Sequence, residues 1–215
     1  MDSPWIQLAA IVVAPFVYHI WWKDYQAQAG GETIENALPG ATPVATWVTI
    51  LAVVGVLVIF AFEVAGEYAL DIVEQQTEMT IVMAAYSIII ASVIEEVIFR
   101  GILYVDRSTA SLIASIVAIS VLFAVVHGHF WTYEPAKGAS WWNFFDATLT
   151  FDFGVKAWFT TGVLFVRSLW LYAMRFIPAN PRRSLIPCIV AHAIANLAVV
   201  IAKAMQGKLL LAWEA

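Results

Sequence analysis

The chain has few charged residues and a single cysteine. Only 13% of its 215 residues are Asp, Glu, Lys or Arg, and 62% are hydrophobic, whereas about a quarter of the residues in a soluble domain are charged. The composition therefore excludes an ordinary soluble domain and predicts a polytopic membrane protein. The lone Cys188 excludes an internal disulfide. The net charge of −5 argues against a nucleic-acid partner.

Apolar stretches long enough to cross a bilayer recur along the chain. A spanning helix needs about 20 apolar residues, so we expect an all-α, polytopic transmembrane helix bundle of about six spans, forming a single integral-membrane domain over residues 1–215. The first stretch lacks a basic start and a small-residue cleavage motif, so we expect a retained span there and not a signal peptide. The expected spans lie near residues 5–22, 44–62, 80–104, 108–126, 155–177 and 185–202.

Two segments between the expected spans have unusual compositions. Residues 63–78 carry five acidic residues and no basic one, which indicates a surface helix or helical extension with a solvated acidic face. Residues 128–154 are dense in aromatic side chains. We expect this segment to form a platform at the membrane interface, with a lid over a cavity as the alternative, and it is a possible binding surface for a membrane-protein partner.

The third expected span carries ionisable residues inside an apolar run. Glu95, Glu96 and Arg100 interrupt the segment from Tyr86 to Tyr104, and such groups are costly near hydrocarbon unless they are paired or functional. Glu96 and Arg100 are four residues apart and share one helical face, so we expect an ion pair. Glu95 points about 100° away and has no partner from its own helix.

Other polar residues lie in the later spans. His127 ends the fourth, and His192 and Asn196 share one face of the sixth. Singly, each could be interfacial or serve as interhelical hydrogen-bond glue; together they indicate a reaction centre. Glu95 would be a general base that shares a water molecule with His127. His192 and Asn196 would donate to a developing oxyanion, which suits hydrolysis of an amide without a covalent intermediate.

Other chemistries fit the sequence less well. The chain has no G-x-S-x-G elbow and no H-E-x-x-H motif, and Ser87 and Ser92 are more simply explained as helix-packing residues. A metal held by His127, His192 and one glutamate stays an alternative. So does a nucleophile at Cys188, which shares the face of His192. The leading interpretation needs neither metal nor cofactor.

The ordered set of motifs resembles the CAAX protease and bacteriocin-processing (CPBP, Abi) family of glutamic-type intramembrane proteases. The resemblance extends over residues 86–200 and implies that Glu96 is held by Arg100. It also implies a prokaryotic cytoplasmic membrane and a membrane-associated peptide or protein substrate, prenylated or not. The motifs are Glu95-Glu96-x-x-x-Arg100 with Gly101-x-Leu103-Tyr104, Phe123-x-x-x-His127, and His192-x-x-x-Asn196.

A different class of function is the alternative. The chain contains ten tryptophans, and a non-enzymatic membrane subunit could bind a protein partner, pigment or other cofactor through its aromatic surfaces. The protease interpretation has a geometric requirement. Straight third and fourth helices would place Glu95 and His127 at unequal distances from their turn, about 18 and 30 Å at about 1.5 Å per residue. We therefore expect a tilt or kink near Gly101 and near Asp106–Thr109.

Overall fold

A computed structural model describes residues 4–127, 130–135 and 147–211 of the chain. Within these residues most of the chain is helical, which confirms the all-α fold class. Five helices are regular, and a sixth is a composite that runs from Ile81 to Ile102. The regular helices are α1 (Pro4–Ala29), α2 (Thr46–Ala69), α5 (Thr109–His127), α6 (Val155–Phe176) and α7 (Ile186–Met205).

The composite helix alternates between two helical geometries. It comprises α3 (Ile81–Tyr86), the π-helical η2 (Ser87–Ala91), α4 (Ser92–Glu95) and the π-helical η3 (Glu96–Ile102). Thr80 caps its start, because the hydroxyl accepts a hydrogen bond from the Met83 amide at 3.2 Å. The distortion expected near Gly101 is present as η3, whereas η2 was not foreseen. The break between the third and fourth spans runs from Leu103 to Ser108.

Four helices in the described residues have the length and composition to cross a membrane. They are α2, the composite helix, α5 and α7, and they match four of the six expected spans. The other two expected spans are also helices, α1 and α6, but they are less apolar. In α6 the charged residues Lys156, Arg167 and Arg175 are all buried. All six expected segments are thus helical. The count of six crossings is supported only roughly, because four of the six helices are apolar enough to span.

Short strands lie at one end of the bundle. β1 (Met79–Thr80) pairs in parallel with β4 (Leu209–Leu210). In the aromatic segment 128–154, β2 (Trp131–Pro135) pairs antiparallel with β3 (Ala147–Phe151). Most of the described part of that segment is thus a β-ladder. Four of its expected platform residues lie outside the described residues: Trp141, Trp142, Phe144 and Phe145.

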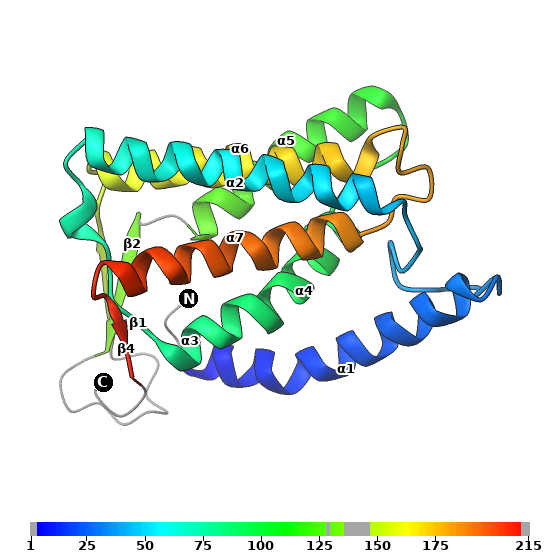
Figure 1. The fold of residues 1–215 in the computed structure, drawn as a ribbon, viewed down its shortest axis with the longest axis horizontal. Coiled ribbons are helices and arrows are strands. Elements are labelled where there is room, and N and C mark those ends of the chain that lie inside the picture. Colours follow the sequence, from blue (N-terminus) through cyan, green and yellow to red (C-terminus); the bar gives the residue numbers. More distant parts are fainter. Residues whose placement is uncertain (1–3, 128–129, 136–146, 212–215) are drawn as a thin grey trace.

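Helix α7 is the central element of the bundle (Figure 1). It packs against α2, α6 and the composite helix. Helix α5 packs on α6, and α1 contacts α4 and η2 on the far side of the composite helix from α7. The three expected site residues on the composite helix, Glu95, Glu96 and Arg100, are all buried.

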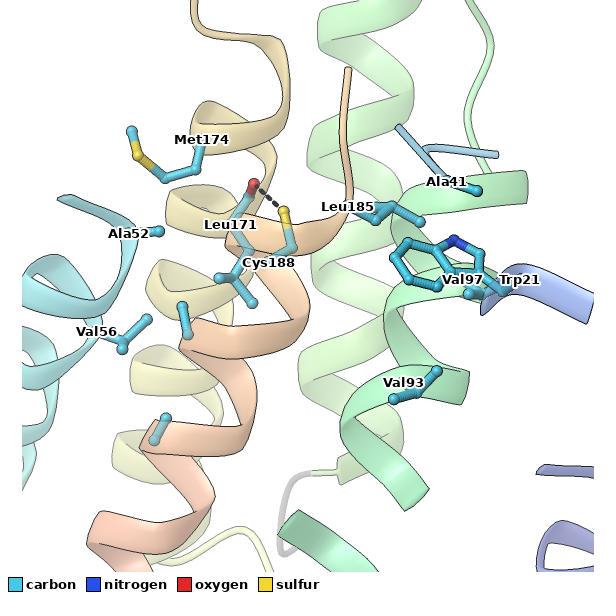
Figure 2. Close-up of a cluster of buried hydrophobic side chains, with 12 residues drawn as sticks. Trp21, Ala41, Ala52, Val56, Val93, Val97, Leu171, Met174, Leu185 and Cys188 are labelled. Atoms are coloured by element: carbon cyan, nitrogen blue, oxygen red, sulfur yellow. Dashed lines mark hydrogen bonds between the residues drawn. The ribbon is translucent and has the colours of Figure 1, made fainter. Parts of the chain in front are cut away.

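The hydrophobic core joins α7 to its neighbours. Cys188 on α7 is fully buried and lies beside Leu171 of α6, with its Sγ 3.2 Å from the Leu171 carbonyl oxygen (Figure 2). Val56 of α2 and Val97 of η3 belong to the same cluster. Trp21 of α1 completes it on the far side and donates its indole N–H to the Pro39 carbonyl at 3.2 Å.

Three connections between helices meet at the opposite end from the strands. The Leu185 amide donates to the Gly40 carbonyl at 2.9 Å, and the Thr42 hydroxyl donates to the Arg182 carbonyl at 3.3 Å. Arg183 pairs with Asp106 in the break between the composite helix and α5. The first, third and fifth connections thus share one end, as expected for helices that alternate in direction.

Candidate active site

The expected ion pair between Glu96 and Arg100 is present and has no exposure to solvent. Arg100 Nη1 lies 2.9 Å from Glu96 Oε1, and both side chains are 0% exposed. Arg100 Nη2 donates to the Ser168 hydroxyl of α6 at 2.9 Å. The guanidinium carbon also lies 4.2 Å from the centre of the Phe123 ring, within the range of a cation–π contact. Arg100 therefore ties η3 to both α5 and α6.

His192 lies between the two glutamates. Its Nδ1 is 2.7 Å from Glu96 Oε1, and its Nε2 is 3.8 Å from Glu95 Oε2. A carboxylate oxygen can only accept a hydrogen bond, so Nδ1 carries the hydrogen in this contact. Glu96 thus sets the orientation of the His192 ring and leaves Nε2 facing Glu95.

Glu95 is buried and faces two histidines. Its Oε1 lies 3.4 Å from His127 Nε2. His127 Nδ1 lies 2.8 Å from the Phe123 carbonyl oxygen, and a carbonyl accepts, so Nδ1 donates and Nε2 is free for a proton exchanged with Glu95 or with water. The residue that has no partner on its own helix has its partners on α5 and α7.

Asn196 is held by the π-helical segment that the sequence did not reveal. Its Nδ2 donates to the Ser87 carbonyl at 2.7 Å, at the start of η2. A primary amide has two N–H donors, so one remains for another acceptor. π-Helical turns often occur at functional sites, and this one positions an expected site residue.

All four residues expected to carry the chemistry line one cavity of about 210 Å³. They are Glu95, His127, His192 and Asn196, contributed by the composite helix, α5 and α7. Glu96 and Arg100 lie behind them and are fully buried. The cavity also has an apolar side, formed by Met83, Tyr86, Ala91, Phe123, Leu164 and Leu171.

Several residues that support the site were missed in the sequence. Ser168 donates to the Ser120 hydroxyl at 3.0 Å, which extends the hydrogen bonds from Arg100 to α5. Tyr172 donates its hydroxyl to the Phe99 carbonyl in η3. The available signal was the i, i+4 spacing of Ser168 and Tyr172, which puts both on one face of α6.

The acidic stretch is also less solvated than expected. Glu63 forms an ion pair with Arg167, which faces the bundle and is 6% exposed. Glu67 is 8% exposed and accepts a hydrogen bond from Gln76. The prediction of a solvated acidic face is therefore wrong for these two residues, because α2 turns them toward α6 and the end of α7.

The residues considered for cysteine or serine chemistry have surroundings that differ from those of Glu95 and His127. The Cys188 thiol faces the Leu171 carbonyl and does not line the cavity. The hydroxyls of Ser87 and Ser92 donate to carbonyls of their own helix, at 2.9 and 2.6 Å. Among the described residues, no group of three or more His, Cys, Asp or Glu side chains has the arrangement to hold a metal ion.

Comparison with known proteins gives one match. Searches of curated proteins and of solved structures each found none. A family model does match, that of the type II CAAX prenyl endopeptidase Rce1-like proteins, over residues 77–198. The matched region begins just before the composite helix and ends within α7, so it contains every residue of the candidate site. The chain belongs to the type II CAAX prenyl endopeptidase Rce1-like family.

Proposed function

We propose that this protein is an integral-membrane endopeptidase that hydrolyses a membrane-associated peptide or protein with a water molecule activated by Glu95 and His127. The observation that carries the proposal is the cavity lined by these two residues together with His192 and Asn196. Membership of a protease family supports the reaction class. The proposed location, the cytoplasmic membrane of a prokaryote, rests on the sequence resemblance alone.

Water activation is assigned to the pair on the composite helix and α5. A water molecule between Glu95 and His127 can give its proton to the Glu95 carboxylate as its oxygen attacks the scissile carbonyl carbon. His127 is suited to sharing that proton, because the Phe123 carbonyl fixes its Nδ1 and leaves its Nε2 3.4 Å from Glu95 Oε1. No covalent enzyme intermediate is needed.

Stabilisation of the oxyanion is assigned to α7. The free N–H of the Asn196 amide and, when the ring is doubly protonated, the Nε2–H of His192 can donate to the carbonyl oxygen as it gains charge. Both donors are held in place by other contacts, His192 by Glu96 and Asn196 by the Ser87 carbonyl. When the C–N bond breaks, the proton held by Glu95 and His127 passes to the leaving nitrogen.

Replacement of Glu95 by Gln tests this assignment. The amide keeps the size of the side chain but cannot accept the proton, and a general acid–base group contributes about 10²- to 10⁴-fold to a rate. Cells that carry Glu95→Gln should accumulate uncut substrate, identified by comparing peptide termini in their membranes with those of native cells. The purified variant should show native thermal unfolding.

Glu78→Gln is the matched control, because Glu78 is exposed and does not line the cavity. Cells with this variant should show native peptide termini. Identical termini in native, Glu78→Gln and Glu95→Gln cells would contradict the proposal. A partner protein that co-purifies in equal amount, with Glu95 dispensable, would instead favour the binding-subunit alternative. Partner binding through the 128–154 segment stays a prediction.

A further inference from the structure

A second cavity adjoins the candidate active site. It has a volume of about 260 Å³ and shares four lining residues with the first cavity: His127, Leu164, Arg167 and Asn196. From there it extends between α2, α6 and α7 toward the segment that contains Gln76, Thr77 and Met79. The proposed catalytic residues His127 and Asn196 therefore face both spaces.

The lining of the second cavity is unusually polar for the interior of a membrane helix bundle. Arg167 pairs with Glu63 at the junction with the first cavity. Glu67 and Lys203 line the second cavity but not the first, and they are 8% and 7% exposed. Charged groups inside a membrane domain typically face the bundle interior or a water-filled cavity, so the position of these side chains indicates hydration.

Arg167 supplies a more specific observation. Its side chain is only 7% exposed, and within the described residues its Nε has no hydrogen-bond partner. A buried donor without a protein partner is costly unless water satisfies it. The cavity beside it is large enough for several water molecules, each of which needs polar partners of the kind that line it.

The outer end of the cavity lies against a polar stretch of backbone. The carbonyls of five consecutive residues, 73–77, accept hydrogen bonds from three lysine side chains. One lysine is on α6, one is on α7 and one lies just after α7. Lys208 reaches three of these carbonyls, Lys156 one and Lys203 one. Glu74 and Thr77 in this stretch are exposed. Polar groups therefore continue from the cavity to the surface of the bundle.

We propose that the second cavity is a hydrated passage through which water and small hydrophilic solutes pass from the surface around residues 73–77 to Glu95 and His127. Arg167 and Glu63 form its inner neck, where the two cavities meet. The passage goes beyond the assignment of catalytic residues. The passage can be tested without measuring turnover, so the test remains valid even if the proposed hydrolysis is wrong.

Accessibility of single cysteines to a charged reagent tests the passage. Cys188 is 0% exposed, so the native chain is a silent background, and modification of Cys188 would report misfolding. Val199→Cys on α7 and Thr160→Cys on α6 place a thiol in the cavity. Leu197→Cys and Ile201→Cys are the controls, because both native side chains are exposed on the outer face of α7, 38% and 51%. A trimethylammonium methanethiosulfonate would be added to both sides of membrane vesicles.

We expect Val199→Cys and Thr160→Cys to react at least about tenfold faster than both controls, because a thiol in lipid stays protonated and unreactive. Ile201 is nearer the end of α7 than Val199, so depth in the membrane alone would give the opposite order. Adding Ala202→Trp, which fills the cavity, should slow the reaction of Val199→Cys by a similar factor. Equal rates at Val199, Leu197 and Ile201, or no effect of Ala202→Trp, would overturn the proposal.

Discussion

Glu96 illustrates how one buried side chain can serve two purposes. Its Oε1 contacts both Arg100 Nη1 and His192 Nδ1, at 2.9 and 2.7 Å. The carboxylate thus compensates the buried guanidinium and also orients a ring that faces the cavity. Removal of either Glu96 or Arg100 leaves the other as an uncompensated charge in the interior, which costs far more than the intact pair gains. A structural role and the proposed functional role are therefore coupled at this residue.

The buried pair should respond very differently from an exposed one. Arg100→Met leaves Glu96 without its cation, and we expect a loss of about 3–5 kcal/mol in the free energy of unfolding. The measurement is folded yield and thermal unfolding in detergent. Normal yield and native unfolding of Arg100→Met would show that the pair is not structural.

Arg183→Met is the control for that experiment. The hydrogen bond that Arg183 donates to Asp106 raises the pKa of the guanidinium. The arginine side chain is, however, 43% exposed and lies outside the spans. Solvent screening limits such exposed pairs to about 0–1 kcal/mol, so we expect near-native yield. A large loss of stability in Arg100→Met with little loss in Arg183→Met would identify burial as the cause of the difference.

At the scale of elements, the π-helical segments decide which side chains meet. The sequence predicted the ion pair of Glu96 and Arg100, because charges inside an apolar run are conspicuous. It did not predict η2, since a change from i, i+4 to i, i+5 hydrogen bonding leaves no compositional signal in the run Ser87–Ala91. The contact between Ser168 and Arg100 was missed as well, because the i, i+4 spacing of Ser168 and Tyr172 shows only that they share a face of α6 and not what that face meets.

Close packing of α2 against α6 depends on a glycine. A Cβ on Gly55 would lie 2.1–2.4 Å from three atoms of the Trp170 ring, and that ring is fixed by its N–H donating to the Ala52 carbonyl at 3.0 Å. Gly55→Ala should therefore force the helices apart and cost about 1–3 kcal/mol, measured by thermal unfolding. Gly162→Ala is the matched control, because a Cβ there meets no atom within 4 Å. Equal stabilities would refute the packing argument.

At the scale of the whole molecule, α6 is an expected crossing that is not among the four helices apolar enough to span by composition alone. Its three charged residues, Lys156, Arg167 and Arg175, are 8%, 6% and 2% exposed. Its exposed residues include Trp158 and Val166, 63% and 50% exposed. The helix is thus polar toward the bundle and apolar toward its surroundings, which suits a spanning helix that borders a hydrated interior.

The distribution of charged and apolar side chains on α6 predicts that this helix crosses the membrane. Phe153 lies just before the helix and Arg182 lies in the turn after it, and both are exposed. If α6 crosses, these two residues lie on opposite sides of the membrane. With Cys188 fully buried, Phe153→Cys and Arg182→Cys each introduce one accessible thiol. A membrane-impermeant thiol reagent added to one side of sealed vesicles of uniform orientation should label one variant and spare the other until the vesicles are permeabilised. Labelling of both variants from the same side would show that α6 does not cross the membrane. Contact with lipid would then not explain why its charged side chains face the bundle.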